Sequence, residues 1–223
     1  MKSLLTLGTG SKGNCYLLSD DDSTLILDAG VKADAIKKVL HWDFSTVSGA
    51  LITHNHKDHS ESADKLEQYG VEVFRPYLIE GGKDQRTFGK WAVQSFDLPH
   101  DGEPCCGFLI RHIDGFTMLY LTDLEYCKYT FQKQNVDAVL IEVNWQKKYV
   151  SENASNYSHK VLGHLSLENG IEFLKVNKTD ALKKVIICHQ SIWTMDEEEC
   201  LDRIRQEIGV EVEAARKDKT FYL

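Results

Sequence analysis

The chain has 223 residues, of which 42% are hydrophobic and 27% are charged, as is usual for a water-soluble globular protein. Only three prolines and the lack of low-complexity stretches argue against an internal linker, so we expect one domain over residues 1–223. The formal net charge of −8 argues against loose, charge-driven binding to nucleic acid, although an enzyme could still handle nucleic acid at a local site.

Residues 1–7 carry one lysine and a short apolar stretch, which lacks the long apolar region of a signal peptide. No stretch of the sequence approaches the length of a membrane span, so we expect a cytoplasmic protein without a membrane partner. The six cysteines contain no Cys-x-x-Cys pair and are expected to be reduced, mostly buried apolar residues.

Apolar runs and alternating patterns predict strands, in chain order, at 2–7, 15–18, 24–27, 48–53, 71–74, 91–96, 107–113, 116–122, 136–143, 184–188, 210–214 and 220–223. Helical spacing predicts helices at 32–40, 58–69, 124–134, 166–176 and 196–208, with Ser166 as the N-cap of the fourth. Residues 80–90 suggest a loop or hairpin, and residues 145–163 are too polar to assign. Two sheets covered by helices on their outer faces would fit this order.

Four residues able to bind metal follow the strand that ends at Thr53. They are His54, His56, Asp58 and His59, and imidazole and carboxylate groups are ligands of Zn²⁺ and similar ions. An extended backbone places His54 and His56 on one side, while the adjacent Asp58 and His59 require the chain to turn. The pattern therefore predicts a metal site, with a chance histidine-rich surface loop as the alternative.

Metal-binding residue types also follow other predicted strands, at positions that a rigid sheet could bring together. Together with His54, which follows its own strand, these residues are Asp28, His100, Asp123, Glu142 and His189. The Gly10–Asn14 loop is not a phosphate-binding Walker loop, because Gly13 follows Lys12. It is either a tight hairpin or a loop that contacts phosphate.

The HxHxDH motif at residues 54–59, followed in order by His100, Asp123 and His189, resembles the metallo-β-lactamase superfamily along the whole chain. The resemblance implies an α/β fold, a four-layer αββα sandwich. It also implies a two-metal site with the following ligands. His54, His56 and His100 would bind the first metal, Asp58, His59 and His189 would bind the second, and Asp123 would bridge both together with a water or hydroxide.

Imidazole and carboxylate ligands without thiolate suit Zn²⁺ first, with Mn²⁺ or iron as alternatives. Asp28 is expected to orient a ligand rather than to bind metal, and Cys188 to point into the core.

Within the superfamily, the chain looks similar to the phosphodiesterase branch that contains ribonuclease Z and the YycJ-like (WalJ-like) proteins. The resemblance lies in Gly10–Asn14, in Gly163–Ser166 and in Val185–Ser191. It implies that His164 is a catalytic proton donor oriented by Glu142, and that Asp58 helps to orient the hydroxide. The alternative is that His164 caps the helix that follows it.

Some family features are missing from the sequence. We find no long insertion like the tRNA-binding arm of ribonuclease Z, no additional β-CASP domain and no hydroxyacylglutathione hydrolase C-terminal domain. Leu124-Glu125 follows Asp123 where YycJ-like proteins commonly have Thr-Gly.

The sequence therefore predicts a binuclear metal-dependent hydrolase, a phosphodiesterase or nuclease whose candidate substrates include DNA and RNA. The alternatives are a hydrolase of a thioester, lactone or β-lactam, and a non-catalytic metal-binding interaction protein. The natural substrate, exo or endo action, the metal in the cell and the oligomeric state are not determined by the sequence.

Weaker expectations concern four other groups of residues. His41, His112 and His159 are expected to be structural or exposed, and the two lysine pairs at 183–184 and 217/219 to be solvated. Trp145, Lys147, Lys148 and Tyr149 either line a nucleic-acid cleft or form an ordinary solvated loop.

Overall fold

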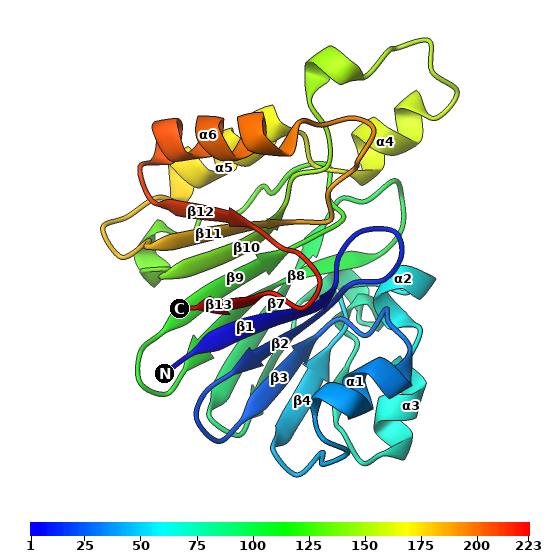
Figure 1. Cartoon of the computed structure of the whole chain (residues 1–223), viewed down its shortest axis with the longest axis vertical. Helices are drawn as coiled ribbons and strands as arrows, with labels where there is room; N and C mark the ends of the chain where they lie inside the picture. Colours follow the sequence, from blue (N-terminus) through cyan, green and yellow to red (C-terminus); the bar gives the residue numbers. More distant parts are fainter.

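Two β-sheets pack face to face, and the computed structural model describes residues 1–223 (Figure 1). The first sheet has the order β13-β1-β2-β3-β4-β5. Its strands are β1 (Ser3–Gly8), β2 (Cys15–Ser19), β3 (Thr24–Leu27), β4 (Val47–Leu51), β5 (Val73–Phe74) and β13 (Thr220–Tyr222). Strands β13 to β3 pair antiparallel, and β3, β4 and β5 pair parallel.

The second sheet has the order β12-β11-β10-β9-β8-β7-β6. Its strands are β6 (Gln85–Phe88), β7 (Trp91–Leu98), β8 (Cys105–His112), β9 (Thr117–Leu121), β10 (Ala138–Glu142), β11 (Lys184–Cys188) and β12 (Glu211–Ala214). Strands β6 to β9 pair antiparallel, and β9 to β12 pair parallel. The C-terminal strand then returns to the first sheet beside β1.

Helices cover the outer faces of both sheets (Figure 1). The helices are α1 (Ala33–Val39), α2 (Lys57–Ser60), α3 (Ala63–Gln68), α4 (Tyr157–Gly163), α5 (Leu167–Asn177) and α6 (Glu197–Ile208). Helices α1 and α3 lie on the first sheet and α5 and α6 on the second, so the predicted αββα sandwich is confirmed. None of these helices has the length and apolar character needed to cross a membrane.

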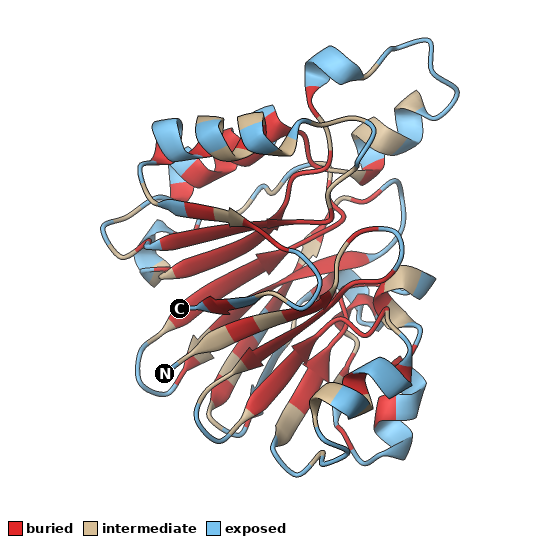
Figure 2. Ribbon diagram, viewed as in Figure 1, coloured by how far each residue is buried: buried red, intermediate tan, exposed pale blue.

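Three apolar layers hold the sandwich together. Leu18, Phe108 and Leu140 belong to the layer between the sheets, where buried strands dominate (Figure 2). Ile36 packs with the first sheet and Ile204 with the second, which explains why each helix is buried on only one side. Burial of such side chains contributes roughly 25 cal/mol per Å² of apolar surface.

Two predicted helices differ from the structure. The helix predicted at 58–69 is two helices, because Ser62 interrupts it by donating its backbone N–H to Ala29 and its hydroxyl to Val31. The helix predicted at 124–134 is wrong. That segment is irregular except for a short 3-10 turn at Gln132–Gln134, and it is held by tertiary contacts of Leu124 with Glu142.

Unassigned or ambiguous segments are also resolved. The stretch 80–90, expected to be a loop or a hairpin, contains β6, which forms a hairpin with β7. Residues 145–163 contain a 3-10 turn at Lys147–Tyr149 and helix α4. Ser166 accepts a hydrogen bond from the backbone of Asn169, so its predicted role as an N-cap is confirmed.

The close approach of the loop after β3 to the loop at 54–59 depends on Gly30. A Cβ atom at this position would lie 1.7 Å from the backbone oxygen of Asp58. We therefore expect Gly30→Ala to displace the loop at 54–59 and to destabilise the fold by at least about 1–3 kcal/mol in urea unfolding, as overpacking does. Gly170→Ala is the matched control, since its Cβ would meet its nearest atom at 3.5 Å inside α5. Equal unfolding midpoints for Gly30→Ala and the wild type would contradict this prediction.

Candidate metal centre

The loop that carries the HxHxDH motif is fixed by the ends of β2 and β3. The backbone N–H of Thr53 donates to Asp28 Oδ1 at 2.8 Å. The N–H groups of Asn14 and Ala29 donate to the carbonyls of Asp58 and His59, at 2.7 and 2.8 Å. These bonds connect the loop to the rigid sheet, so its side chains are positioned before any ligand binds.

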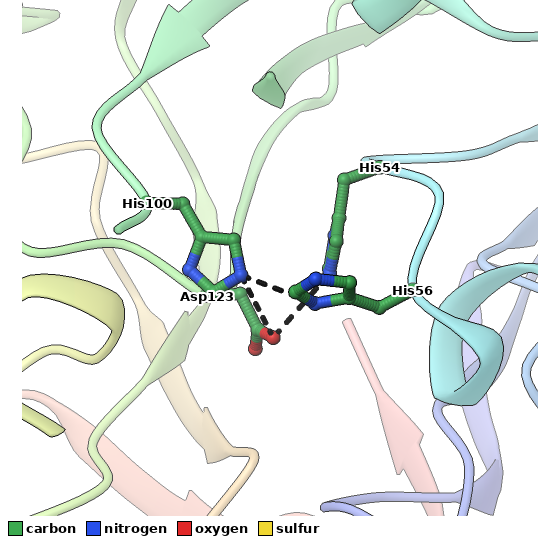
Figure 3. Close-up of side chains that lie close together, drawn as sticks. All are labelled: His54, His56, His100 and Asp123. Carbon is green, nitrogen blue, oxygen red and sulfur yellow. Dashed lines mark hydrogen bonds and ion pairs between the residues drawn. The ribbon is translucent and has the colours of Figure 1, made fainter. Parts of the chain in front are cut away.

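One group of predicted ligands contains His54, His56, His100 and Asp123, whose ligand atoms lie within 4.8 Å of one another (Figure 3). His100 Nε2 lies 3.3 Å from His56 Nδ1 and 3.9 Å from Asp123 Oδ2, and His54 Nε2 lies 3.5 Å from the same carboxylate oxygen. These residues follow β4, β7 and β9, so the group joins the ends of strands from both sheets.

The second group contains Asp58, His59 and His189, also with ligand atoms within 4.8 Å. Asp58 Oδ2 lies 3.7 Å from His59 Nε2 and 3.6 Å from His189 Nε2. Asp123 lies between the two groups, because its Oδ2 is 3.3 Å from His59 Nε2 and its Oδ1 is 3.2 Å from His189 Nδ1. The structure thus brings all seven predicted ligands together around one carboxylate.

Two buried ring nitrogens support a fit to metal ions. His54 Nε2 and His189 Nε2 have no hydrogen-bond partner, although a buried polar atom without one is unfavourable. Both atoms belong to the groups just described, where a cation would supply the missing partner. The donor set of five imidazoles and two carboxylates suits divalent metals.

Electrostatics keep His54 and Asp123 in the forms that metal binding requires. Burial, together with the nearby His59, lowers the pKa of His54 well below its usual value, so this imidazole is neutral. Burial alone would raise the pKa of Asp123, but His189 and His59 hold it well below the usual range, so this carboxyl group is ionised.

Outer contacts set the orientation of the ligand rings. His100 Nδ1 lies 2.8 Å from the carbonyl of Gly163, and His59 Nδ1 lies 2.7 Å from Asp28 Oδ2. In each ring, a proton on Nδ1 leaves an unprotonated Nε2 on the side of the centre, where Nε2 of His59 also meets the Asn14 amide. Asp28 is therefore placed to orient a ligand, and Cys188 lies in the buried layer between the sheets, as expected.

Glu142 lies at the centre of a second network. Its Oε1 lies 2.8 Å from His164 Nδ1 and 2.9 Å from His189 Nδ1, while its Oε2 accepts the backbone N–H groups of Leu124 and Leu165, each at 3.2 Å. Burial favours the neutral acid, but His164 and His189 lower the pKa of Glu142, so it is ionised. His164 does not cap α5, because Ser166 does.

Sequence reasoning missed several supporting residues. Thr53 and Tyr120 donate hydroxyl protons to Asp28, and Asn14 Nδ2 lies 2.9 Å from His59 Nε2. Asn144 donates a hydrogen bond to the carbonyl of His189 and accepts one from Lys160 Nζ. Asn14 ends the glycine-rich loop and Lys160 lies one helical turn before His164, but neither position signals a contact without the fold.

The remaining sequence expectations have mixed outcomes. His112 is structural, with its ring nitrogens 2.9 Å from Asp20 and Asp114. Lys184 is not solvated as predicted. It is buried in β11 because its ammonium group reaches Glu211 and Glu213 on the neighbouring strand.

The structure also describes the two loops, at residues 10–14 and 145–149, for which the sequence left alternatives. The 10–14 loop contains the tight turn, since Gly13 donates its N–H to the Gly10 carbonyl. In the 145–149 loop, Lys148 pairs with Glu199 and the indole of Trp145 donates to the His164 carbonyl.

Comparison with known proteins agrees with this fold. The sequence model of the Metallo-beta-lactamase superfamily matches residues 8–95. The metallo-β-lactamase fold protein YhfI from Bacillus subtilis superimposes with a TM-score of 0.73 at 15% identity, covering 99% of this chain and 98% of YhfI. Human tRNase Z, short form, gives a TM-score of 0.64 at 14% identity, covering 99% and 98%. The chain is thus a metallo-β-lactamase-fold protein, and the resemblance is confirmed.

Its sequence relatives are more specific. Exodeoxyribonuclease WalJ from Streptococcus pneumoniae is 26% identical over 217 residues, which cover 83% of this chain and 80% of WalJ. Exodeoxyribonuclease YycJ from Bacillus anthracis is 25% identical over 217 residues, covering 83% and 81%. The expected similarity to YycJ-like proteins is therefore confirmed.

Metal binding should stabilise the folded chain, because an unfolded chain does not preserve the site. We expect Zn²⁺ at about 100 times its dissociation constant to add about 2.7 kcal/mol per site and to raise the melting temperature, and EDTA to reverse this. Differential scanning fluorimetry with elemental analysis measures both effects. His54→Ala should lose most of the shift, whereas His41→Asn, remote from the site, should retain it. An equal shift in both variants would exclude His54 as a ligand.

Proposed function

We propose that this chain is a binuclear metal-dependent hydrolase of phosphodiester bonds, with one domain over residues 1–223. The main support is the position of Asp123 between two ligand groups, with the Glu142–His164 pair beside them. Relatives named as exodeoxyribonucleases favour DNA as the substrate, and RNA is the second candidate.

In this proposal, His54, His56 and His100 would hold one metal, Asp58, His59 and His189 would hold the other, and Asp123 would be shared by both. When bound, two divalent cations supply Lewis-acid chemistry and make a water acidic near neutral pH. Zn²⁺ is our first choice, with Mn²⁺ or iron as alternatives. The cations would also add about +4 to an acidic protein at the place where a phosphate must bind.

The chain's own residues then position and move protons. Asp58 is partly exposed at the centre and would orient the attacking water. His164 has its Nδ1 beside Glu142, which leaves Nε2 to donate a proton to the departing oxygen. The buried carboxylate of Glu142 fixes the orientation of the His164 ring through its contact with Nδ1.

Two other functions are less well supported. Hydrolysis of a thioester or lactone would not require the Glu142–His164 pair. A non-catalytic metal-binding protein would not be expected to keep the complete ligand set. The cytoplasmic location predicted from the sequence remains part of the proposal.

A substrate panel distinguishes these functions. We would measure hydrolysis of bis-p-nitrophenyl phosphate, a thioester, a lactone, and DNA and RNA strands, each with Zn²⁺ and with Mn²⁺. Faster turnover of the thioester or lactone than of every phosphodiester would reject the proposal, and so would inactivity on the entire panel.

The bridging carboxylate should be essential. Asp123→Ala is expected to abolish tight metal binding and phosphodiester hydrolysis, because one carboxylate contacts both ligand groups. His56→Ala should have the same effect through the first metal. Metal content and turnover measure the outcome, and full activity in either variant would exclude the two-metal assignment.

The role of His164 should depend on the leaving group. His164→Ala is expected to retain metal but to lose about 100-fold or more in turnover of DNA, whose departing oxygen needs a proton. Hydrolysis of bis-p-nitrophenyl phosphate should fall far less, because p-nitrophenolate leaves without protonation. An equal loss on both substrates would reject proton donation by His164.

A further inference from the structure

A pocket with a volume of about 760 Å³ lies beside the metal centre. It lies among the loop after β1, the loop after β11 and the segment between β12 and β13, which are blue, orange and red in Figure 1. Its volume is within the range of roughly 300–1,000 Å³ that is typical of small-molecule sites. Neither the metal ligands nor the Glu142–His164 pair lines it.

Direct contacts connect this pocket to the metal centre. The backbone N–H of His189 donates to Thr9 Oγ1 at 2.9 Å, and Gln190 and Ser191, which follow it, line the pocket. Lys12 lines both this pocket and a smaller hollow that includes Asp58. A ligand in the pocket would therefore lie next to a substrate group held at the metals.

The charge of the pocket is opposite to that of the whole chain. Lys12, Arg216 and Lys217 line it together with a single acidic residue, Glu197, which pairs with Arg216. The ammonium groups of Lys12 and Lys217 lie within 4.0 Å of no carboxylate, so their charges are not neutralised. In a protein of net charge −8, this arrangement favours an anionic group next to the site.

The same pocket has an apolar side with an exposed aromatic ring next to it. Ile192 and Met195 line it, and Ile192 and its neighbour Trp193 are 82% and 84% exposed. Flat aromatic rings on such a rim stack with nucleic-acid bases of any sequence. Trp193 is not among the lining residues but follows Ile192 directly in the chain. Cations in the pocket and an exposed aromatic ring next to it are together suited to a nucleotide.

We propose that this pocket binds one nucleoside monophosphate unit of the substrate strand, adjacent to the phosphodiester that is cleaved. Lys12 and Lys217 contact its phosphate, and Ile192 and Trp193 contact its base. The substrate class rests on the proposed function. The pocket gives the enzyme a preference for nucleic-acid strands over small diesters, without reading a base sequence.

The kinetic test compares a strand with a small diester. In the double variant Lys12→Ala/Lys217→Ala, KM for oligo(dT) should rise about tenfold or more beyond any change in KM for bis-p-nitrophenyl phosphate. The reason is that only the strand reaches the pocket. Lys12→Arg/Lys217→Arg should restore most of the difference. Lys133→Ala, at the opposite end of β10, is the control and should change neither substrate. Equal changes on both substrates in the double alanine variant would overturn the inference.

A binding test separates the pocket from catalysis. Fluorescence anisotropy of labelled oligo(dT) with metal-free protein should show weaker binding in Lys12→Ala/Lys217→Ala and in Trp193→Ala, and free thymidine monophosphate should compete with the strand. Trp42→Ala, which removes another exposed tryptophan (69%), should bind like the wild type. Wild-type binding by both pocket variants would reject the pocket even if hydrolysis is normal. Weakened binding without hydrolysis by the wild type would instead reject the proposed reaction.

Discussion

The buried carboxylate of Asp123 is the group on which the candidate centre depends. Burial makes an ionised carboxylate unfavourable unless opposite charges or hydrogen-bond donors surround it. Here imidazoles from both sheets surround it, including His54, His59 and His189. Asp123 also has a positive φ of 50°, as do Asp28 and His189 at 56° and 48°. Such backbone strain persists where the surrounding structure enforces it, and it concentrates at functional sites.

Rigidity around the centre comes from two other buried carboxylates. Asp28 holds Thr53 and the ring of His59 on the side of the first sheet. Glu142 holds His164 and His189 on the side of the second. Both oxygens of each carboxylate have hydrogen-bonding partners, so each carboxylate positions the rings that contact it. The sandwich thus supplies the centre with one orienting acid from each sheet.

The residues proposed for the chemistry and the residues proposed for substrate recognition lie in different parts of the structure. Most of the ligands follow strand ends and Glu142 ends β10, where the sheets fix the backbone, while Asp58 and His59 lie in α2 and His164 between α4 and α5. The neighbouring pocket is formed by loops that bring Lys12 and Lys217 together from opposite ends of the chain. Changes in these loops could alter which phosphodiester is accepted while the strand ends keep the same reaction.

The sequence by itself indicated most strands through local patterns, and its resemblance to a known family implied the fold class and the seven candidate ligands. Apolar runs mark buried strands, and His54 to His59 follow one of them within six residues. Only the tertiary structure decided which atoms meet. Asn14 contacts His59, and Lys217 lines the same pocket as Lys12. The segment 124–134, expected to be a helix, is irregular and hydrogen-bonds to Glu142, and Lys184 is buried. These outcomes depend on partners distant in the chain, about which local periodicity carries no information.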